Sequence, residues 1–177
     1  RKARRVLIQL PEGLRGQLFS IVETVESTGA EALVSGDPCY GACDLPLEEA
    51  GKLNVDLIIH YGHTKLLSEV GFPIVYIPAK AKVPISNVTK KSLLLLKNYD
   101  KIGLITTAQH LHKLSEAAKI LREGGKEVVV GDSNAILHPG QVLGCDYRNA
   151  LAVSDSVDAF LFVGGGRFHA LGAALST

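Results

Sequence analysis

The chain has 177 residues, of which 46% are hydrophobic and 21% are charged, a composition typical of a globular protein with a buried core. Its 19 basic and 18 acidic residues give a formal charge of +1, which offers no electrostatic basis for binding nucleic acid or an anionic membrane surface. The longest apolar runs, such as residues 93–96, are far too short to span a bilayer. We therefore expect neither a nucleic-acid partner nor a membrane segment.

The first half of the chain alternates short apolar runs with a segment of helical periodicity. The predicted strands span residues 6–10, 32–34, 57–60 and 74–77. A helix is predicted over residues 14–27, because apolar residues recur on one face from Leu14 to Val25. Gly29 stands where a glycine commonly terminates a helix.

The second half follows a proline-containing crossing segment and repeats the same alternation. Its predicted strands span residues 101–105, 127–130 and 159–163, and its predicted helices span residues 86–96, 111–123 and 168–177. Strands that alternate with helices indicate an α/β fold with mainly parallel sheets. We expect two repeated βα domains, residues 1–84 and residues 85–177.

The two halves each place a cysteine at the same point of a repeated pattern. The first copy reads Gly36-Asp37, then Gly41-Ala42-Cys43-Asp44, then Val55-Asp56. The second reads Gly131-Asp132, then Leu143-Gly144-Cys145-Asp146, then Val157-Asp158. Cys43 and Cys145 lie equally far before the aspartate of each Val-Asp pair, so both are expected in a loop that follows a strand.

Three cysteines without a secretory signal indicate a reducing compartment, and we expect a cytoplasmic protein whose thiols act as ligands or nucleophiles. The basic run at residues 1–5 leads directly into a predicted strand and is interpreted as its solvated flank. The sequence contains no methionine and begins with Arg1, so we expect a trimmed polypeptide.

Cys43 and Cys145 are the candidate metal ligands, because thiolates from equivalent positions of two related units can converge on one point. Thiolates prefer zinc or iron–sulfur clusters. The alternative is that both thiols pack as small hydrophobic side chains. Zinc would need further ligands, for which the candidates are His60, His63, His110, His138 and His169. Cys39 is interpreted as a spare thiol or a packing residue, with a role as an additional ligand left open.

Glycines and polar residues that follow predicted strands are candidate ligand contacts, since ligands bind at the carboxyl ends of parallel strands. Gly164, Gly165 and Gly166 lie between a strand and a helix, where glycine permits close approach of a polar group and the helix N-terminus favours an anion. A tight turn would explain them equally well. His110 and Gln141 lie in two further polar loops.

Four segments together resemble the archaeal-type enzyme of the first step of diphthamide biosynthesis. They are residues 40–44 (YGACD), 107–110 (TAQH), 139–145 (PGQVLGC) and 168–172, with Phe168-His169 and Leu171-Gly172. The resemblance covers nearly the whole chain in the same order. It implies a transferase that moves the 3-amino-3-carboxypropyl group of S-adenosylmethionine to C2 of a histidine of translation elongation factor 2, through a radical generated at a [4Fe-4S] cluster.

The resemblance further implies a cytoplasmic homodimer of three-domain subunits, served by an electron donor, in which each domain gives one cysteine to a single cluster. By motif, Cys43 and Cys145 are two of these ligands, whereas Cys39 matches none. The third ligand is expected in a third domain after residue 177. Gly164, Gly165, Gly166, Gln141 and His110 are expected to contact S-adenosylmethionine, and no acid–base residue is assigned. The alternatives are a non-catalytic cluster-holding or electron-relay paralogue, and a zinc-dependent hydrolase.

Overall fold

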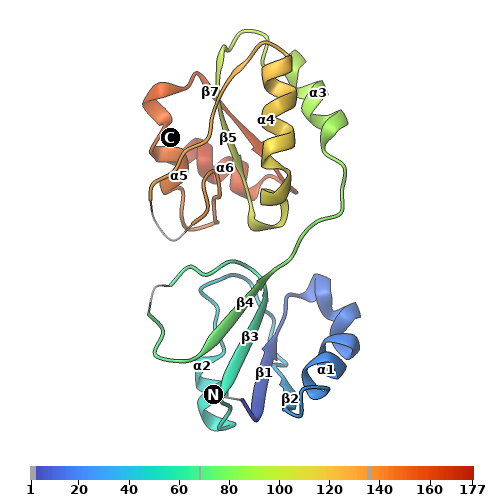
Figure 1. Cartoon of the computed structure of the whole chain (residues 1–177). Coiled ribbons are helices and arrows are strands. Elements are labelled where there is room, and N and C mark those ends of the chain that lie inside the picture. The colour runs from blue at the N-terminus through green and yellow to red at the C-terminus, as the bar shows by residue number, and fades with distance from the viewer. Residues whose placement is uncertain (1–2, 68, 135–136) are drawn as a thin grey trace. The chain divides into compact units, whose positions relative to one another are not determined.

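A computed structural model describes residues 3–67, 69–134 and 137–177, and it confirms the α/β fold with parallel sheets (Figure 1). The chain separates into two compact units, Arg1–Ala79 and Lys80–Thr177. The predicted boundary lies after residue 84, so residues 80–84 belong with the second unit in the structure. No helix in the described ranges combines the length and the hydropathy needed to cross a membrane.

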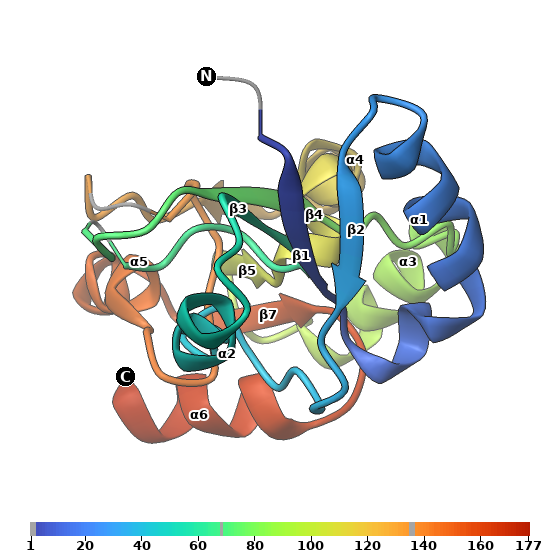
Figure 2. The ribbon, with the colours of Figure 1, turned by 90° about the horizontal axis from the view of Figure 1, so that it is seen from below.

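The first unit is built on a parallel sheet with helices on both faces. In the described part of this unit the strand order is β2-β1-β3-β4. The strands are β1 (Arg5–Gln9), β2 (Glu31–Val34), β3 (Leu57–Gly62) and β4 (Ile74–Pro78). The helices are α1 (Leu18–Glu26) and α2 (Leu47–Lys52). Figure 2 shows α1 and α2 on opposite faces of this sheet.

The burial of alternate strand residues explains the two covered faces of the first sheet. Val6 and Ile8 of β1 pack with α1, whereas Leu7 packs with Ala50 of α2 and with Ile58. Successive side chains of a strand point to opposite faces, so a strand buried on both faces reads as a continuous apolar run.

The first helix begins later than its apolar pattern predicts. Residues Glu12–Gln17 form a 3-10 helix, and the α-helix starts only at Leu18. Gly13 and Gly16 lie in this segment, and glycine disfavours an α-helix interior because of its backbone freedom. Gly29 follows the helix with a φ of 84°, as expected for a residue that terminates it.

The second unit repeats this design. Its strand order over the described residues is β6-β5-β7, all parallel. The strands are β5 (Lys101–Thr106), β6 (Glu127–Val129) and β7 (Ala159–Val163). The helices are α3 (Ser86–Leu95), α4 (Leu114–Glu123), α5 (Arg148–Leu151) and α6 (Phe168–Ser176), with 3-10 helices at Ala108–Lys113 and Ser154–Ser156.

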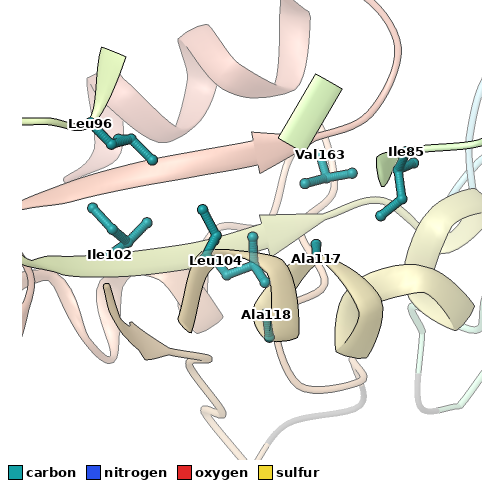
Figure 3. Close-up of a cluster of buried hydrophobic side chains, with 8 residues drawn as sticks. Ile85, Leu96, Ile102, Leu104, Ala117, Ala118 and Val163 are labelled. Carbon is teal, nitrogen blue, oxygen red and sulfur yellow. The ribbon is translucent and has the colours of Figure 1, made fainter. Parts of the chain in front are cut away.

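One face of the second sheet packs against α3 and α4. Figure 3 shows this cluster, in which Ile102 and Leu104 of β5 meet Ala117 and Ala118 of α4. The opposite face packs against α5 and α6 through a second cluster that includes Ile105 of β5. The short helices α2 and α5 were not predicted, because helices of one or two turns are too short to display a 3.6-residue period.

The repeat extends to the contacts that start each sheet. The Asp56 carboxylate accepts hydrogen bonds from the backbone N–H groups of Arg4 and Arg5, at 2.7 and 3.0 Å. The Asp158 carboxylate accepts the equivalent bonds from Asp100 and Lys101, both at 2.8 Å. These bonds lower the pKa of both carboxyl groups. The Val-Asp pair of each repeat therefore holds the start of the central strand.

Two equivalent glycines of the repeat are expected to respond differently to substitution. An alanine Cβ at Gly131 would lie 1.8 Å from the backbone oxygen of Asn149, whereas one at Gly36 would meet no atom within 4 Å. We expect Gly131→Ala to lower the free energy of unfolding by about 1–3 kcal/mol, since backbone must move. Gly36→Ala should change it by less than about 0.5 kcal/mol. Urea unfolding tests this, and equal midpoints for the two variants would contradict it.

Replacing Asp56 or Asp158 by asparagine should lower the melting temperature at pH 7. Because their folded-state pKa is lowered, their stabilisation is present above the unfolded value of about 3.9 and is lost as the pH falls through the folded value. The difference from the parent should therefore shrink in acid. Melting curves at several pH values test this, with Glu23→Gln on the exposed side of α1 as the control. A difference that does not change with pH would refute it.

Candidate functional site

Cys43 and Cys145 occupy equivalent places in the two units. Cys43 lies in the loop that follows β2, and Cys145 lies in the loop that follows β6. Both loops therefore leave the carboxyl edge of their own parallel sheet, where such sheets bind ligands. Both side chains are exposed. Each unit thus presents one accessible thiol at the carboxyl edge of its sheet, as the repeated pattern predicts.

The Cys43 loop is tied to the ends of the two neighbouring strands. The amide nitrogen of the buried Gln9 side chain, at the end of β1, donates to the carbonyl oxygen of Asp44 at 2.8 Å. The Gln9 side-chain oxygen accepts from Nδ1 of His60, on β3, at 2.7 Å. A turn from Gly41 to Asp44, closed by a 3.1 Å backbone bond, holds Cys43 between them. The thiol is therefore exposed on a fixed turn.

The Cys145 loop is a turn of similar size with a different anchor. Leu143 and Asp146 exchange backbone hydrogen bonds of 2.9 and 3.3 Å, which places Cys145 at the tip. The side chain of Arg148 bonds both carboxylate oxygens of Asp146 and keeps the pKa of that carboxyl below its usual value. A Cβ at Gly144 would lie 2.4 Å from the Phe168 ring, so glycine lets α6 approach this turn.

His110 and Gly164 lie together on one cavity of the second unit. This cavity has a volume of about 330 Å³. Its lining is mostly apolar and comprises Val83, Pro84, Ile85, Val88, Thr89, Ser92, His110, Leu161, Phe162, Val163 and Gly164. Burial is the main cause that lowers the pKa of His110, so its ring is neutral at pH 7. Its Nδ1 is buried and has no hydrogen-bond partner within the described ranges, and a ligand group could supply one.

The three glycines form the turn from β7 to α6, and they differ in what they permit. Gly166 has a φ of 70°, so the turn itself favours glycine there. A Cβ at Gly164 would lie 2.4 Å from the Phe162 ring, whereas Gly165 faces open space. Gly166 also faces open space, so a ligand has room beside both Gly165 and Gly166.

Gln141 is fully buried and supports its own loop. Its side-chain oxygen accepts from the backbone N–H of His138 at 3.3 Å, and its backbone oxygen accepts from the side chain of Asn149 at 2.9 Å. Residue 141 also forms an isolated parallel bridge with Thr106, at the end of β5. These contacts attach the loop that carries Cys145 to the carboxyl edge of the second sheet.

The first unit contains a cluster of three side chains that the sequence offered only as separate candidate ligands. The side chains of Cys39, His60 and His63 place their Sγ and nitrogen atoms within 4.8 Å of one another. Cys39 is buried, and burial raises the pKa of its thiol to about 11. The available signal was His60-x-x-His63 at the end of a strand, but its pairing with Cys39 depends on two loops that only the fold brings together.

Comparisons with known proteins agree with the motifs. The sequence profile of a family of diphthamide synthesis proteins matches residues 10–177. The chain is 39% identical over 177 residues to the 2-(3-amino-3-carboxypropyl)histidine synthase of Pyrococcus horikoshii, covering 99% of this chain and 51% of that protein. It is 33% identical to subunit 1 of the synthase of that name from Schizosaccharomyces pombe, covering 96% of this chain and 40% of that protein.

The structural comparison gives the same family. The crystal structure of Dph2 from Pyrococcus horikoshii with a 4Fe-4S cluster matches with a TM-score of 0.88 at 38% identity, covering 97% of this chain and 51% of that chain. The chain spans about half the length of the curated relatives it matches. The matched profile and the matched structures establish that the chain belongs to the diphthamide synthesis family.

Proposed function

We propose that this chain belongs to a 2-(3-amino-3-carboxypropyl)histidine synthase, which transfers the 3-amino-3-carboxypropyl group of S-adenosylmethionine to C2 of a histidine of translation elongation factor 2. The carrying observation is the pair of exposed thiols, Cys43 and Cys145, on equivalent turns of a chain 39% identical to an enzyme of that name. The relatives span further residues, so a third domain is part of the proposal. A homodimer and an external electron donor are proposed because the family resemblance implies them.

The donor set fits an iron–sulfur cluster. Cys43 and Cys145 offer soft thiolate ligands on turns that leave the sulfur accessible, and a cluster is held by such ligands. We assign them as two ligands of a [4Fe-4S] cluster, with a third thiolate from the region of the relatives that this chain does not span. When bound, the cluster would supply the electron that breaks the sulfur–carbon bond of S-adenosylmethionine.

The cavity beside His110 is the proposed place for the amino-acid end of S-adenosylmethionine. A neutral imidazole can accept a hydrogen bond from the substrate ammonium or donate one to its carboxylate. The backbone of Gly164, Gly165 and Gly166 leads into α6, whose N-terminus favours a carboxylate. In this proposal Gln141 acts by holding the edge of the site. The chain's residues position the substrate, and no residue acts as a general base in the bond-breaking step.

Loss of either cluster ligand should remove iron. Cys43→Ala and Cys145→Ala, made in the full-length protein and purified without oxygen, are expected to lose the four-iron signal in electron paramagnetic resonance, together with the transfer activity. Cys39→Ser is the control and should keep the iron. Full iron in both alanine variants would exclude this ligand set. Iron without consumption of S-adenosylmethionine would instead favour a cluster-holding subunit, and colourless zinc on Cys43 and Cys145 would favour a hydrolase.

Substitution of His110 should affect catalysis and leave the iron content unchanged. A hydrogen bond to a charged group contributes about 1.5–3 kcal/mol, so His110→Ala is expected to lower kcat/KM for S-adenosylmethionine by about tenfold or more. His112→Ala, two residues along and exposed, is the matched control and should retain activity. Equal kcat/KM values for the two variants would remove His110 from the substrate site.

A further inference from the structure

The cluster of Cys39, His60 and His63 brings three metal-binding atoms to one point. Nε2 of His60 lies 3.0 Å from Nδ1 of His63, and Sγ of Cys39 lies 3.9 Å from the same Nδ1. The residues come from two loops and a strand: Cys39 follows β2, His60 is in β3, and His63 directly follows β3. Cys39 and His60 are buried and His63 is half-buried, so the donor atoms face the protein interior.

These separations suit a tetrahedral ion. Zinc binds a thiolate sulfur at about 2.3 Å and an imidazole nitrogen at about 2.0–2.1 Å. In a tetrahedral arrangement these lengths place two nitrogens about 3.3 Å apart, and a sulfur and a nitrogen about 3.6 Å apart. The observed 3.0 and 3.9 Å each differ from these values by about 0.3 Å. All three donor atoms lie within 4.8 Å of one another, so side-chain rotations can bring them to bonding distance.

The surroundings prepare His60 to act as a ligand. Its Nδ1–H donates to Gln9 at 2.7 Å, which leaves the lone pair of Nε2 directed at His63. Metal-bound histidines are usually oriented in this way, by a second hydrogen bond from the other ring nitrogen. Burial lowers the pKa of His60 to about 4, so the ring is neutral at physiological pH. The Asp44 carboxylate acts electrostatically on Cys39, His60 and His63, and this negative charge favours a cation.

The repeat shows that the fold does not require these polar groups. Gln9 and His60 are register partners of β1 and β3, and the corresponding partners of β5 and β7 are Ile105 and Phe162. Ile105 and Phe162 pack in an apolar cluster. Burying an amide and an imidazole is costly unless both are satisfied. At equivalent positions, the first unit therefore buries a polar pair of side chains and the second buries a hydrophobic pair.

The hydroxyl of Tyr76 is a further buried polar group, and its ring lies beside that of His60. The Tyr76 ring lies 5.4 Å from the His60 ring, between centroids. Its hydroxyl is buried and has no hydrogen-bond partner among the residues that the structure describes. A water molecule on a metal ion would be a suitable kind of partner, because three protein ligands leave the fourth position of a tetrahedral ion open.

We propose that Cys39, His60 and His63 bind one zinc ion, and that this site does not use Cys43 or Cys145. Zinc is the ion of choice for a set of one thiolate and two imidazoles. Binding releases the thiol proton of Cys39, so affinity rises with pH. The ion joins the loop after β2 to the end of β3. The zinc proposal rests on the arrangement of these three side chains and is independent of the proposed function.

The test is zinc binding to the full-length protein, measured by mass spectrometry of the metal and by competition with a chromophoric chelator. We expect one zinc per chain in the parent. Cys39→Ser and His63→Ala should weaken binding by more than the roughly 10–100-fold expected when an outer partner of a ligand is lost. The Cys43→Ala and Cys145→Ala proteins, which lack the proposed cluster ligands, should keep their zinc.

Two further measurements guard against a folding artefact. Zinc should raise the melting temperature of the parent, because an ion that binds only the folded state stabilises that state. It should not raise the melting temperature of Cys39→Ser, which lacks a ligand. Cobalt in place of zinc should give a thiolate-to-metal charge-transfer band that disappears in Cys39→Ser and persists in Cys43→Ala. No zinc above that of a Cys39→Ser and His63→Ala double variant would overturn the proposal. Zinc that depends on Cys43 rather than Cys39 would overturn it as well, and would leave the iron test of Cys43 and Cys145 unaffected.

Discussion

Parallel pairing of a central strand with a neighbour on each side is the constraint on which both units depend. β1 pairs with β2 and β3, and β5 pairs with β6 and β7. Parallel pairing sends every strand end to one edge, so the loops after β2 and β3 must meet there. The turns of Cys43 and Cys145 take their positions from this arrangement.

The two units share the same arrangement of central and neighbouring strands and differ in the side chains at the carboxyl edge of each sheet. Asp56 and Asp158 hold the strand starts with the same backbone hydrogen bonds. At the opposite edge, the first unit places a buried Gln9 and His60 where the second has apolar residues. The first unit therefore offers a histidine and thiol cluster beside its cysteine turn. The second offers a largely apolar cavity lined by His110, whose Nδ1 has no hydrogen-bond partner among the residues that the structure describes.

The sequence predicted most strands and helices because each has a strong local signal. The parallel strands are continuous apolar runs, and α4 has a clear apolar face. The predicted start of α1 at residue 14 was wrong, because the segment Glu12–Gln17, which contains two glycines, forms a 3-10 helix. The predicted helix over residues 111–123 likewise begins as a 3-10 helix and becomes α-helical only at Leu114. Helix ends depend on local backbone preferences that a periodic pattern does not encode.

By itself, the sequence determined the α/β class, the internal repeat and the equivalence of Cys43 and Cys145, because each is a property of residue order and spacing. Tertiary structure alone decided which side chains meet. Cys39 joins His60 and His63 because two loops leave the same sheet edge, and no spacing along the chain shows that contact. His110 and Gly164 share a cavity for the same reason. A site assembled from separate loops is fixed by strand order and register, which arise only when the chain folds.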